Sequence, residues 1–316
     1  MIPPHWRLER TTRARLVSRV VRWLRLSTGR LDHAGPVPSA FPNGHFYSPV
    51  PNVADLEARA AHLFVPREAM PGIDLESAGH AALIAAALPL AREFDFPSID
   101  PGGELGATRY FSGNSQFTGL DALALFALLR HWRPRRLIEV GSGFSTLLIA
   151  EVNLRFLGGG VHVTCIDPYP RPFLRGTPQG IAEVRVEAVQ DTPVSLFTEL
   201  RAGDVLFIDS SHVAKTGSDV VHLLLDVVPR LAPGVRVHVH DVFLPDDYPR
   251  AWSVEENRGW NEQYLLQALL TDSPRYRVLF ASHHAARRHA EALRAALGVS
   301  HLDPLPTGGS FWFECR

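Results

Sequence analysis

Short apolar stretches recur along the last two thirds of the chain, separated by segments with apolar residues at helical spacing. The apolar stretches predict seven strands, at 136–141, 161–166, 184–189, 204–209, 235–240, 276–281 and 309–315. The clearest helix is predicted over 218–231, where Pro233-Gly234 ends an apolar face made of Val220, Val221, Leu224, Leu225, Val228 and Leu231. Strands alternating with helices indicate an α/β fold with a doubly wound sheet.

The first 107 residues follow a different pattern. Residues 28–55 are rich in Pro, Gly, Ser and Asn, and alanine- and leucine-rich stretches at 53–63 and 76–93 predict helices that a proline-rich segment at 97–103 ends. We therefore expect a region of basic helix, linker and helical cap over 1–107 and a sheet domain over 108–316. Such a cap commonly lies over the open end of a sheet and shapes a substrate pocket.

Arginines alternate with apolar residues at helical spacing over 13–25, which predicts a basic amphipathic helix. We favour packing of this helix on its own domain or on a second copy of the chain, with peripheral membrane contact through residues 1–30 as the alternative. A nucleic-acid arm is disfavoured, because aromatic residues are sparse there and 32 basic side chains nearly balance 33 acidic ones overall. Neither a spanning segment nor a signal-peptide core is evident. Cys165 and Cys315 lie in predicted strands, and isolated core thiols suit a reducing cytoplasm.

The segment 136–146 carries the most information about function, because a buried strand ends there in an acid and a glycine loop before a helix begins. Gly141 and Gly143, on either side of Ser142, let the backbone approach a ligand, and Ser145 and Thr146 can begin the helix. A dinucleotide loop would need Gly or Ala at Thr146, and a Walker loop would need Gly-Lys-Ser/Thr. The negative charge of Glu139 would repel a pyrophosphate, whereas it would attract a ligand that carries an ammonium and a sulfonium.

The next strand ends in Asp167-Pro168, where an acid is placed for ribose hydroxyls. Glu-x-Gly-x-Gly followed by an acid that closes the second strand resembles the class I S-adenosylmethionine-dependent methyltransferases. Segments 207–217, 238–245 and 260–266 are similar to a bacterial subgroup of them, and the resemblance covers roughly 108–316. It implies a Rossmann-like, seven-stranded, mostly parallel sheet with an antiparallel last strand, and S-adenosylmethionine as cofactor.

The resemblance also implies roles for individual residues around the cofactor. Tyr110 and Asn114 would touch its methionine end, although Asn114 is equally suited to cap a helix. Asp191 would lie where the family contacts adenine, although an Asp before Thr192-Pro193 also suits a helix start. The predicted cofactor residues are therefore Tyr110, Asn114, Glu139, Gly141, Ser142, Gly143, Ser145, Thr146, Asp167, Pro168, Asp191 and Asp209.

Polar residues at the ends of the fourth and fifth strands are the candidates for chemistry, because the carboxyl ends of parallel strands meet at one edge of a sheet. His212 or His240 can act as a base toward an acceptor hydroxyl. Alternatively, Asp209, His240 and Asp241 can hold Mg²⁺, as acids from these strand ends do in the catechol-type O-methyltransferases. The imidazole makes Mn²⁺ or Fe²⁺ a better match.

Lys215 is the last candidate for catalysis, together with His212, His240 and Asp241. Its charge could lower the pKa of an acceptor hydroxyl, as a lysine does in those metal-dependent enzymes. There the lysine follows the metal-binding acid by three residues, whereas Lys215 follows Asp209 by six. A solvated position near the start of a helix is the alternative.

These observations predict a cytoplasmic enzyme that methylates a hydroxyl of a small metabolite, with a strand-end histidine as base. Two other functions stay open: a metal-dependent oxidation on the same fold, and a non-catalytic scaffold that binds the cofactor and is tethered to a membrane.

Overall fold

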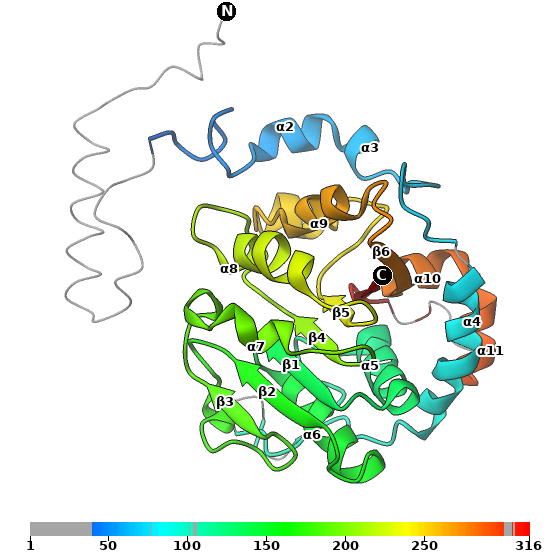
Figure 1. Cartoon of the computed structure of the whole chain (residues 1–316). Coiled ribbons are helices and arrows are strands. Elements are labelled where there is room, and N and C mark those ends of the chain that lie inside the picture. Colours follow the sequence, from blue (N-terminus) through cyan, green and yellow to red (C-terminus); the bar gives the residue numbers. More distant parts are fainter. Residues whose placement is uncertain (1–39, 77, 101, 104–105, 300–304, 306) are drawn as a thin grey trace, which may run out of the picture. The chain divides into compact units, whose positions relative to one another are not determined.

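The computed structural model describes residues 40–76, 78–100, 102–103, 106–299, 305 and 307–316 (Figure 1). The predicted basic helix lies outside this range. The described part forms two compact units, one of residues 40–64 with 249–259 and one of residues 65–248 with 260–316. Residues 65–107 therefore belong to the same unit as the sheet, whereas the sequence pattern suggested a division at residue 108.

The smaller unit consists of three short helical segments: α2 (Val53–Ala58), α3 (Ala60–Leu63) and the π-helical turn η7 (Ala251–Glu255). The side chain of Asn52 caps α2 by accepting hydrogen bonds from the amides of Ala54 and Asp55. The predicted helix over 53–63 is interrupted at Arg59, whose backbone leaves the helical region. Within the stretch 249–259, the Arg258 guanidinium stacks 3.9 Å from the centre of the Trp252 ring and stabilises that stretch.

The larger unit is built on a seven-stranded sheet with the order β3-β2-β1-β4-β5-β7-β6. All neighbouring pairs are parallel except those of β7, which runs antiparallel to β5 and β6. The order reverses between β1 and β4, so the carboxyl ends of these strands open a crevice at the reversal. The strands are β1 (Arg136–Val140), β2 (His162–Ile166), β3 (Glu183–Arg185), β4 (Val205–Ile208), β5 (Arg236–Val239), β6 (Tyr276–Ala281) and β7 (Phe311–Cys315).

Helices cover both faces of the sheet, and alternate strand residues enter two separate cores. Leu137 and Phe207 pack on the face that carries α5, α6 and α11, whereas Ile138 and Leu206 pack on the face that carries α7, α8 and α9. The helical segments are α4 (Ala78–Ala87), η2 (Leu88–Glu93), α5 (Gly119–Trp132), α6 (Phe144–Phe156), η3 (Pro172–Leu174), η4 (Val189–Asp191), α7 (Val194–Thr198), α8 (Asp219–Val221), η5 (His222–Val227), η6 (Val228–Arg230), α9 (Glu262–Leu270), α10 (Ser282–Arg288) and α11 (Ala290–Leu297).

Two predicted elements differ from the observed ones. The strand expected over 184–189 ends at Arg185, because β3 is an edge strand with a single partner and Val189 instead begins the 3₁₀ turn η4. The helix expected over 218–231 runs from Asp219 to Arg230, but it changes from α to π to 3₁₀ geometry along its length. Pro229 has no amide hydrogen for an α-helical bond, which accounts for the change at its end.

The predicted cap helix over 76–93 appears as α4 followed by η2. Its residues Ile84 and Leu88 are buried in the core shared with α5 and α11. Ala87 is buried there as well, so the helix belongs to the helical layer on one face of the sheet. None of its described residues lines the cavity described below.

Cys165 and Cys315 are buried, unpaired thiols within strands, as expected. Among the helices that the structure describes, none is long and apolar enough to cross a membrane.

Candidate active site

The loop after β1 contains a glycine at which any side chain would clash with the backbone. Gly141 has φ +80°, and a Cβ placed on it would lie 1.8 Å from the carbonyl oxygen of Asp209. Its amide donates to the Ile166 carbonyl at 2.9 Å, so the loop is held between β2 and the end of β4. The tight turn brings the backbone of Ser142 and Gly143 to the surface of the crevice.

Glu139 lies beneath this loop and organises it. Its two oxygens accept hydrogen bonds from the hydroxyls of Ser145 and Thr146, both at 2.7 Å, and the Thr146 hydroxyl in turn accepts from the Gly143 amide at 3.0 Å. The sequence suggested that this carboxyl faces a ligand. It is instead fully buried, and it is not among the residues that line the cavity described below. Burial raises the pKa of Glu139 to about 7, even though the hydroxyls of Ser145 and Thr146 favour its charged form.

This pKa gives the folding stability a defined pH dependence. The folded chain holds the Glu139 proton more tightly than the unfolded chain, so the free energy of unfolding should fall as pH rises from the ordinary value of 4.5 to about 7. We expect the wild type to lose on the order of 3 kcal/mol relative to Glu139→Gln across this window. Urea unfolding of both proteins between pH 4 and 8 measures the difference, and a difference that stays constant with pH would contradict the raised pKa.

Asp167, the acid at the end of β2, fixes the other side of the loop. Its carboxylate accepts from the Ser142 amide at 2.8 Å and from the Tyr169 amide at 2.7 Å. The carboxylate still lines the cavity, and each oxygen retains a lone pair for a ligand hydroxyl. The role of Asp167 at a ribose stays a prediction.

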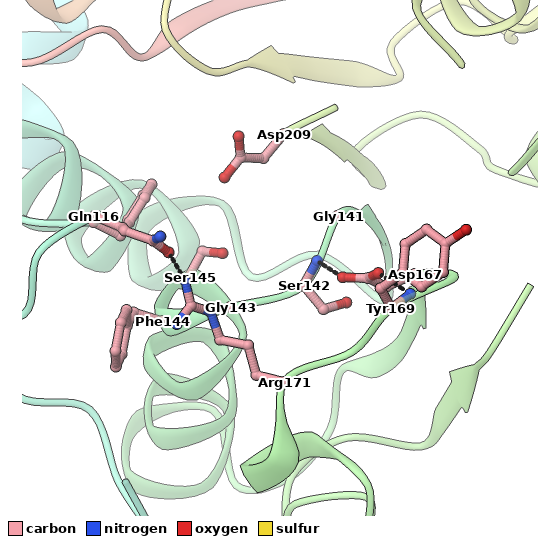
Figure 2. Close-up of a pocket in the computed structure, with 11 residues that line it drawn as sticks. Gln116, Gly141, Ser142, Gly143, Phe144, Ser145, Asp167, Tyr169, Arg171 and Asp209 are labelled. Atoms are coloured by element: carbon pink, nitrogen blue, oxygen red, sulfur yellow. Dashed lines mark hydrogen bonds between the residues drawn. The ribbon is translucent and has the colours of Figure 1, made fainter. Parts of the chain in front are cut away.

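A cavity of about 360 Å³ opens above the loop at the carboxyl ends of the strands (Figure 2). We refer to it as the loop cavity. Backbone of the glycine loop, the Asp167 carboxylate and aromatic rings form its walls, a combination that suits a ligand with both polar and planar parts. The lining residues are Gln116, Phe117, Gly141, Ser142, Gly143, Phe144, Ser145, Asp167, Tyr169, Arg171 and Asp209.

Tyr110 and Asn114, expected at the methionine end of the cofactor, lie behind this wall. The Tyr110 hydroxyl donates to the Phe117 carbonyl at 2.7 Å, and the Asn114 side chain accepts from the amides of Gln116 and Phe117 at 3.1 and 2.8 Å. Both residues are buried. They hold the turn that presents Gln116 and Phe117 to the cavity, and these two contact residues were not predicted.

Three further lining residues were also missed. These residues are Phe144, Tyr169 and Arg171. Tyr169 is exposed beside Asp167. The Arg171 guanidinium donates to the Gln116 side chain and lies 5.2 Å from the centre of the Phe144 ring. Tyr169 and Arg171 follow Asp167 within four residues, so their position just after the second strand was the sequence signal that could have indicated them. In contrast, the predicted cofactor residues Pro168 and Asp191 are exposed and are not among the lining residues.

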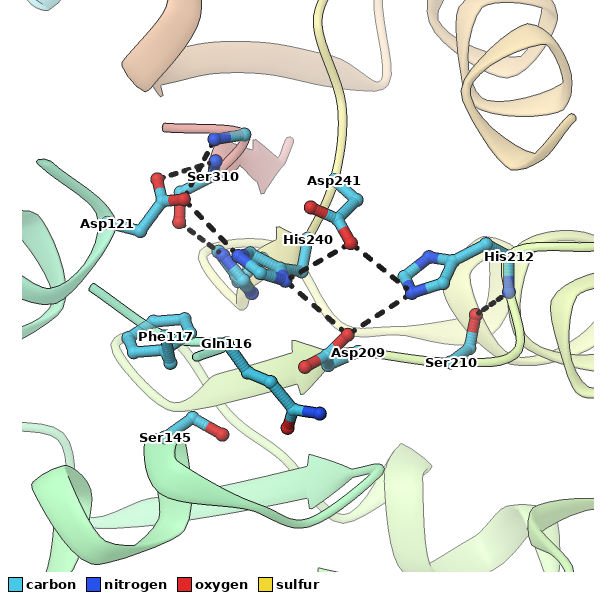
Figure 3. Close-up of polar contacts among 12 residues, drawn as sticks. Gln116, Phe117, Asp121, Ser145, Asp209, Ser210, His212, His240, Asp241 and Ser310 are labelled. Atoms are coloured by element: carbon cyan, nitrogen blue, oxygen red, sulfur yellow. Dashed lines mark hydrogen bonds and ion pairs between the residues drawn. The ribbon is translucent and has the colours of Figure 1, made fainter. Parts of the chain in front are cut away.

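Four side chains from the ends of β4 and β5 face one another beside the loop cavity (Figure 3). We call them the strand-end cluster: Asp209, His212, His240 and Asp241. The Nε2 atom of His212 lies 3.4 Å from Asp209 Oδ1 and 3.6 Å from Asp241 Oδ2. The Nδ1 atom of His240 lies 3.5 and 3.8 Å from the same two oxygens. The two imidazoles thus stand on opposite sides of a pair of carboxylates. The predicted convergence of these strand ends is observed.

Each imidazole is held from behind by a second carboxylate that sequence reasoning did not find. Glu262 accepts from His212 Nδ1 at 2.9 Å, and Asp121 lies 3.2 Å from His240 Nε2. Asp121 is itself fixed by the amides of Gly309 and Ser310, both at 2.8 Å. Such outer carboxylates orient a ring and increase the basicity of its other nitrogen.

The backbone and the charges around the cluster are both unusual. His212 and Asp241 have left-handed φ values of 61° and 56°, a conformation that needs support from surrounding contacts. Burial alone would lower the pKa of His212, but the hydrogen bonds and charges of Asp209 and Glu262 raise it to about 10. Burial would raise the pKa of Asp209, but the charges of His240 and His212 hold it well below its usual range. The carboxylates therefore favour the protonated form of His212.

The donor atoms of the cluster also suit a metal ion. Asp209, His240 and Asp241 each offer one ligand atom, and these atoms lie within 4.8 Å of one another. His212 Nε2 faces the same oxygens of Asp209 and Asp241. Lys215, by comparison, is an exposed residue in the turn before α8, where its backbone bonds to Ser218, and its catalytic role stays a prediction.

Comparison with known proteins agrees with the fold and the loop. Residues 138–242, from the middle of β1 to just past β5, match a family model described as a methyltransferase domain. The sheet order, the glycine loop and this match define a class I S-adenosylmethionine-dependent methyltransferase.

The chain belongs to the same family as a protein of Archaeoglobus fulgidus that is described as uncharacterized; the two are 39% identical over 170 residues, which cover 51% of this chain and 73% of the archaeal protein. Solved structures with a distant likeness include the methyltransferase PaMTH1 of Podospora anserina, bound to SAH (14% identity, TM-score 0.38, 89% of this chain and 100% of that chain). Another is the O-methyltransferase TomG of Streptomyces achromogenes, bound to SAM (15%, 0.36, 83% and 95%).

Proposed function

We propose that this protein transfers the methyl group of S-adenosylmethionine to a hydroxyl of a small molecule. One observation carries the proposal: Asp209 lines the loop cavity and is also a member of the strand-end cluster. A cofactor bound in the cavity would therefore present its methyl group beside the groups that can activate an acceptor. This proximity supplies the orientation on which methyl transfer depends.

The loop cavity provides matching groups for each part of the cofactor. Asp167 is placed to accept from ribose hydroxyls, and the exposed ring of Tyr169 next to it offers a flat apolar surface. The charge of Asp209 attracts a sulfonium or an ammonium. Gly141 and Gly143 leave room for the ligand to approach the backbone.

The strand-end cluster favours activation of the acceptor by a divalent cation over proton removal by a free histidine. A base needs a free lone pair that faces the acceptor, whereas both ring nitrogens of His212 lie beside carboxylates, Nδ1 beside Glu262 and Nε2 beside Asp209. Asp209, His240 and Asp241 would hold the cation together with His212, and mixed nitrogen and oxygen donors suit Mn²⁺ or Fe²⁺ better than Mg²⁺. Such an ion lowers the pKa of a hydroxyl that it binds. Asp121 and Glu262 would keep both imidazoles oriented.

Calorimetric titration with S-adenosylmethionine tests the cofactor assignment directly. Wild-type protein should bind it, and Asp167→Ala should bind roughly 10- to 100-fold more weakly, because the variant loses the carboxylate that holds the Ser142 and Tyr169 amides. Asp226→Asn, which changes an exposed acid on η5, serves as the control and should bind normally. Well-folded wild type that binds no cofactor, with or without Mn²⁺, would contradict the proposal.

The donor set also keeps one competing function in view. Two imidazoles and two carboxylates around one point are ligands that Fe²⁺ accepts, and oxygen consumption by the iron-loaded protein without S-adenosylmethionine would indicate an oxidase instead.

The proposed membrane contact of residues 1–30 and a homo-oligomer stay predictions. Cosedimentation with anionic vesicles, with and without residues 1–30, tests the former.

A further inference from the structure

A second group of histidines lies away from the loop cavity, in the helical layer. His80 is on α4, His284 is on α10, and His289 is at the junction of α10 and α11. One nitrogen of each ring lies within 4.8 Å of the others, and the ring centres are 5.1 to 5.8 Å apart. We call these three residues the helix histidine cluster. None of them is used by the proposed methyl transfer.

A carboxylate lies beside two members of this cluster. Glu76, just before α4, places Oε1 3.1 Å from His284 Nε2 and Oε2 3.5 Å from His289 Nε2. Both nitrogens are inaccessible to solvent, and the geometry of neither contact is that of a hydrogen bond. Arg288 also approaches Glu76, with its Nε atom 3.4 Å from Oε1, and balances part of the carboxylate charge.

A backbone contact orients one of the three rings. His80 Nδ1 donates to the Leu75 carbonyl at 3.0 Å, a contact that orients the ring and leaves the lone pair of the neutral form on Nε2. Imidazoles that converge in this way bind a metal ion through the lone pair of their neutral form.

We propose that His80, His284 and His289 bind Zn²⁺, with Glu76 as the fourth ligand. Three imidazoles and one carboxylate match the nitrogen-rich, four-ligand preference of zinc. Because all four positions would be filled by protein groups, the site would be structural, linking α4 to the helices that follow β6 across about 200 residues of sequence. The strand-end cluster differs, since its carboxylates leave it richer in oxygen.

Metal binding by the full-length chain tests this site. In an Asp209→Asn background, which weakens the strand-end cluster, we expect one equivalent of Co²⁺ to bind with the intense visible absorption of a tetrahedral ion, and Zn²⁺ to displace it. His289→Ala in the same background should bind Co²⁺ at least about 100-fold more weakly. Because His289 is partly exposed, this variant is the one expected to fold. His283→Ala is the matched control: its ring is on α10, next to His284, but bonds to Asp246 at 2.8 Å.

A second readout separates a structural metal from adventitious binding. Added Zn²⁺ should raise the melting temperature of the Asp209→Asn protein and of its His283→Ala derivative, and leave that of the His289→Ala derivative unchanged. The proposal is overturned if the Asp209→Asn protein binds no Co²⁺, or if His289→Ala binds it as tightly as His283→Ala. Either result would identify the cluster as a metal-free network of histidines and Glu76. Neither outcome depends on methyl transfer.

Discussion

Asp209→Asn is expected to abolish methyl transfer and to weaken Mn²⁺ binding by roughly 100-fold. The substitution removes the charge that His212 Nε2 and His240 Nδ1 both face at 3.4 and 3.5 Å. It also removes an oxygen that Asp241 cannot replace, because Asp241 is on the other side of the cluster (Figure 3). Cofactor and acceptor would then meet without an activating group between them.

Two measurements check this result. Mn²⁺ binding is followed by calorimetry, and turnover is followed as S-adenosylhomocysteine released with a panel of small hydroxyl compounds. Asp226→Asn controls for the loss of one negative charge and should behave as the wild type. Undiminished turnover in Asp209→Asn would remove the strand-end cluster from the mechanism.

Gly141→Ala should destabilise the fold and eliminate cofactor binding together. The added Cβ would meet the Asp209 carbonyl oxygen at 1.8 Å, and the φ of +80° is unfavourable for alanine by about 1–2 kcal/mol before any clash. Relieving the overlap requires the loop to move away from the end of β4. We therefore expect the free energy of unfolding to fall by at least about 2 kcal/mol.

Gly158→Ala separates backbone strain from the clash. Gly158 also has a positive φ, +67°, but a Cβ there would meet no atom within 4 Å. This variant should lose only about 1–2 kcal/mol and bind S-adenosylmethionine normally. Urea unfolding and calorimetry on both variants give the comparison, and equal stability losses would show that the contact with Asp209 yields easily.

Much of the fold was predictable because its signals are local. Each strand of the sheet begins within two residues of its predicted position, since the central parallel strands are buried and therefore need an uninterrupted apolar stretch. Exceptions occur where context decides: β3 stops early at the sheet edge, and Pro229 changes the helical geometry before Leu231. The direction of β7 followed from family resemblance and not from its residues.

The candidate site divides in the same way. The convergence of Asp209, His212, His240 and Asp241 could be predicted, because neighbouring parallel strands bring their carboxyl ends together. The placement of Tyr110 and Asn114 could not, since a polar residue near a cavity can equally hold its wall from behind. Only the folded chain shows that both side chains form hydrogen bonds with the backbone of the turn at Gln116 and Phe117.

The sequence by itself determined the sheet, the glycine loop and the acids at the strand ends, because each depends on residues close together in the chain. The tertiary structure decided which side chains act in pairs. Asp121 meets His240 across 119 positions and Glu262 meets His212 across 50. Helix packing fixes the rotation that aims each carboxylate at its ring, and it also gathers His80, His284 and His289. Rotation of a helix is set by the whole core, so no local pattern records it.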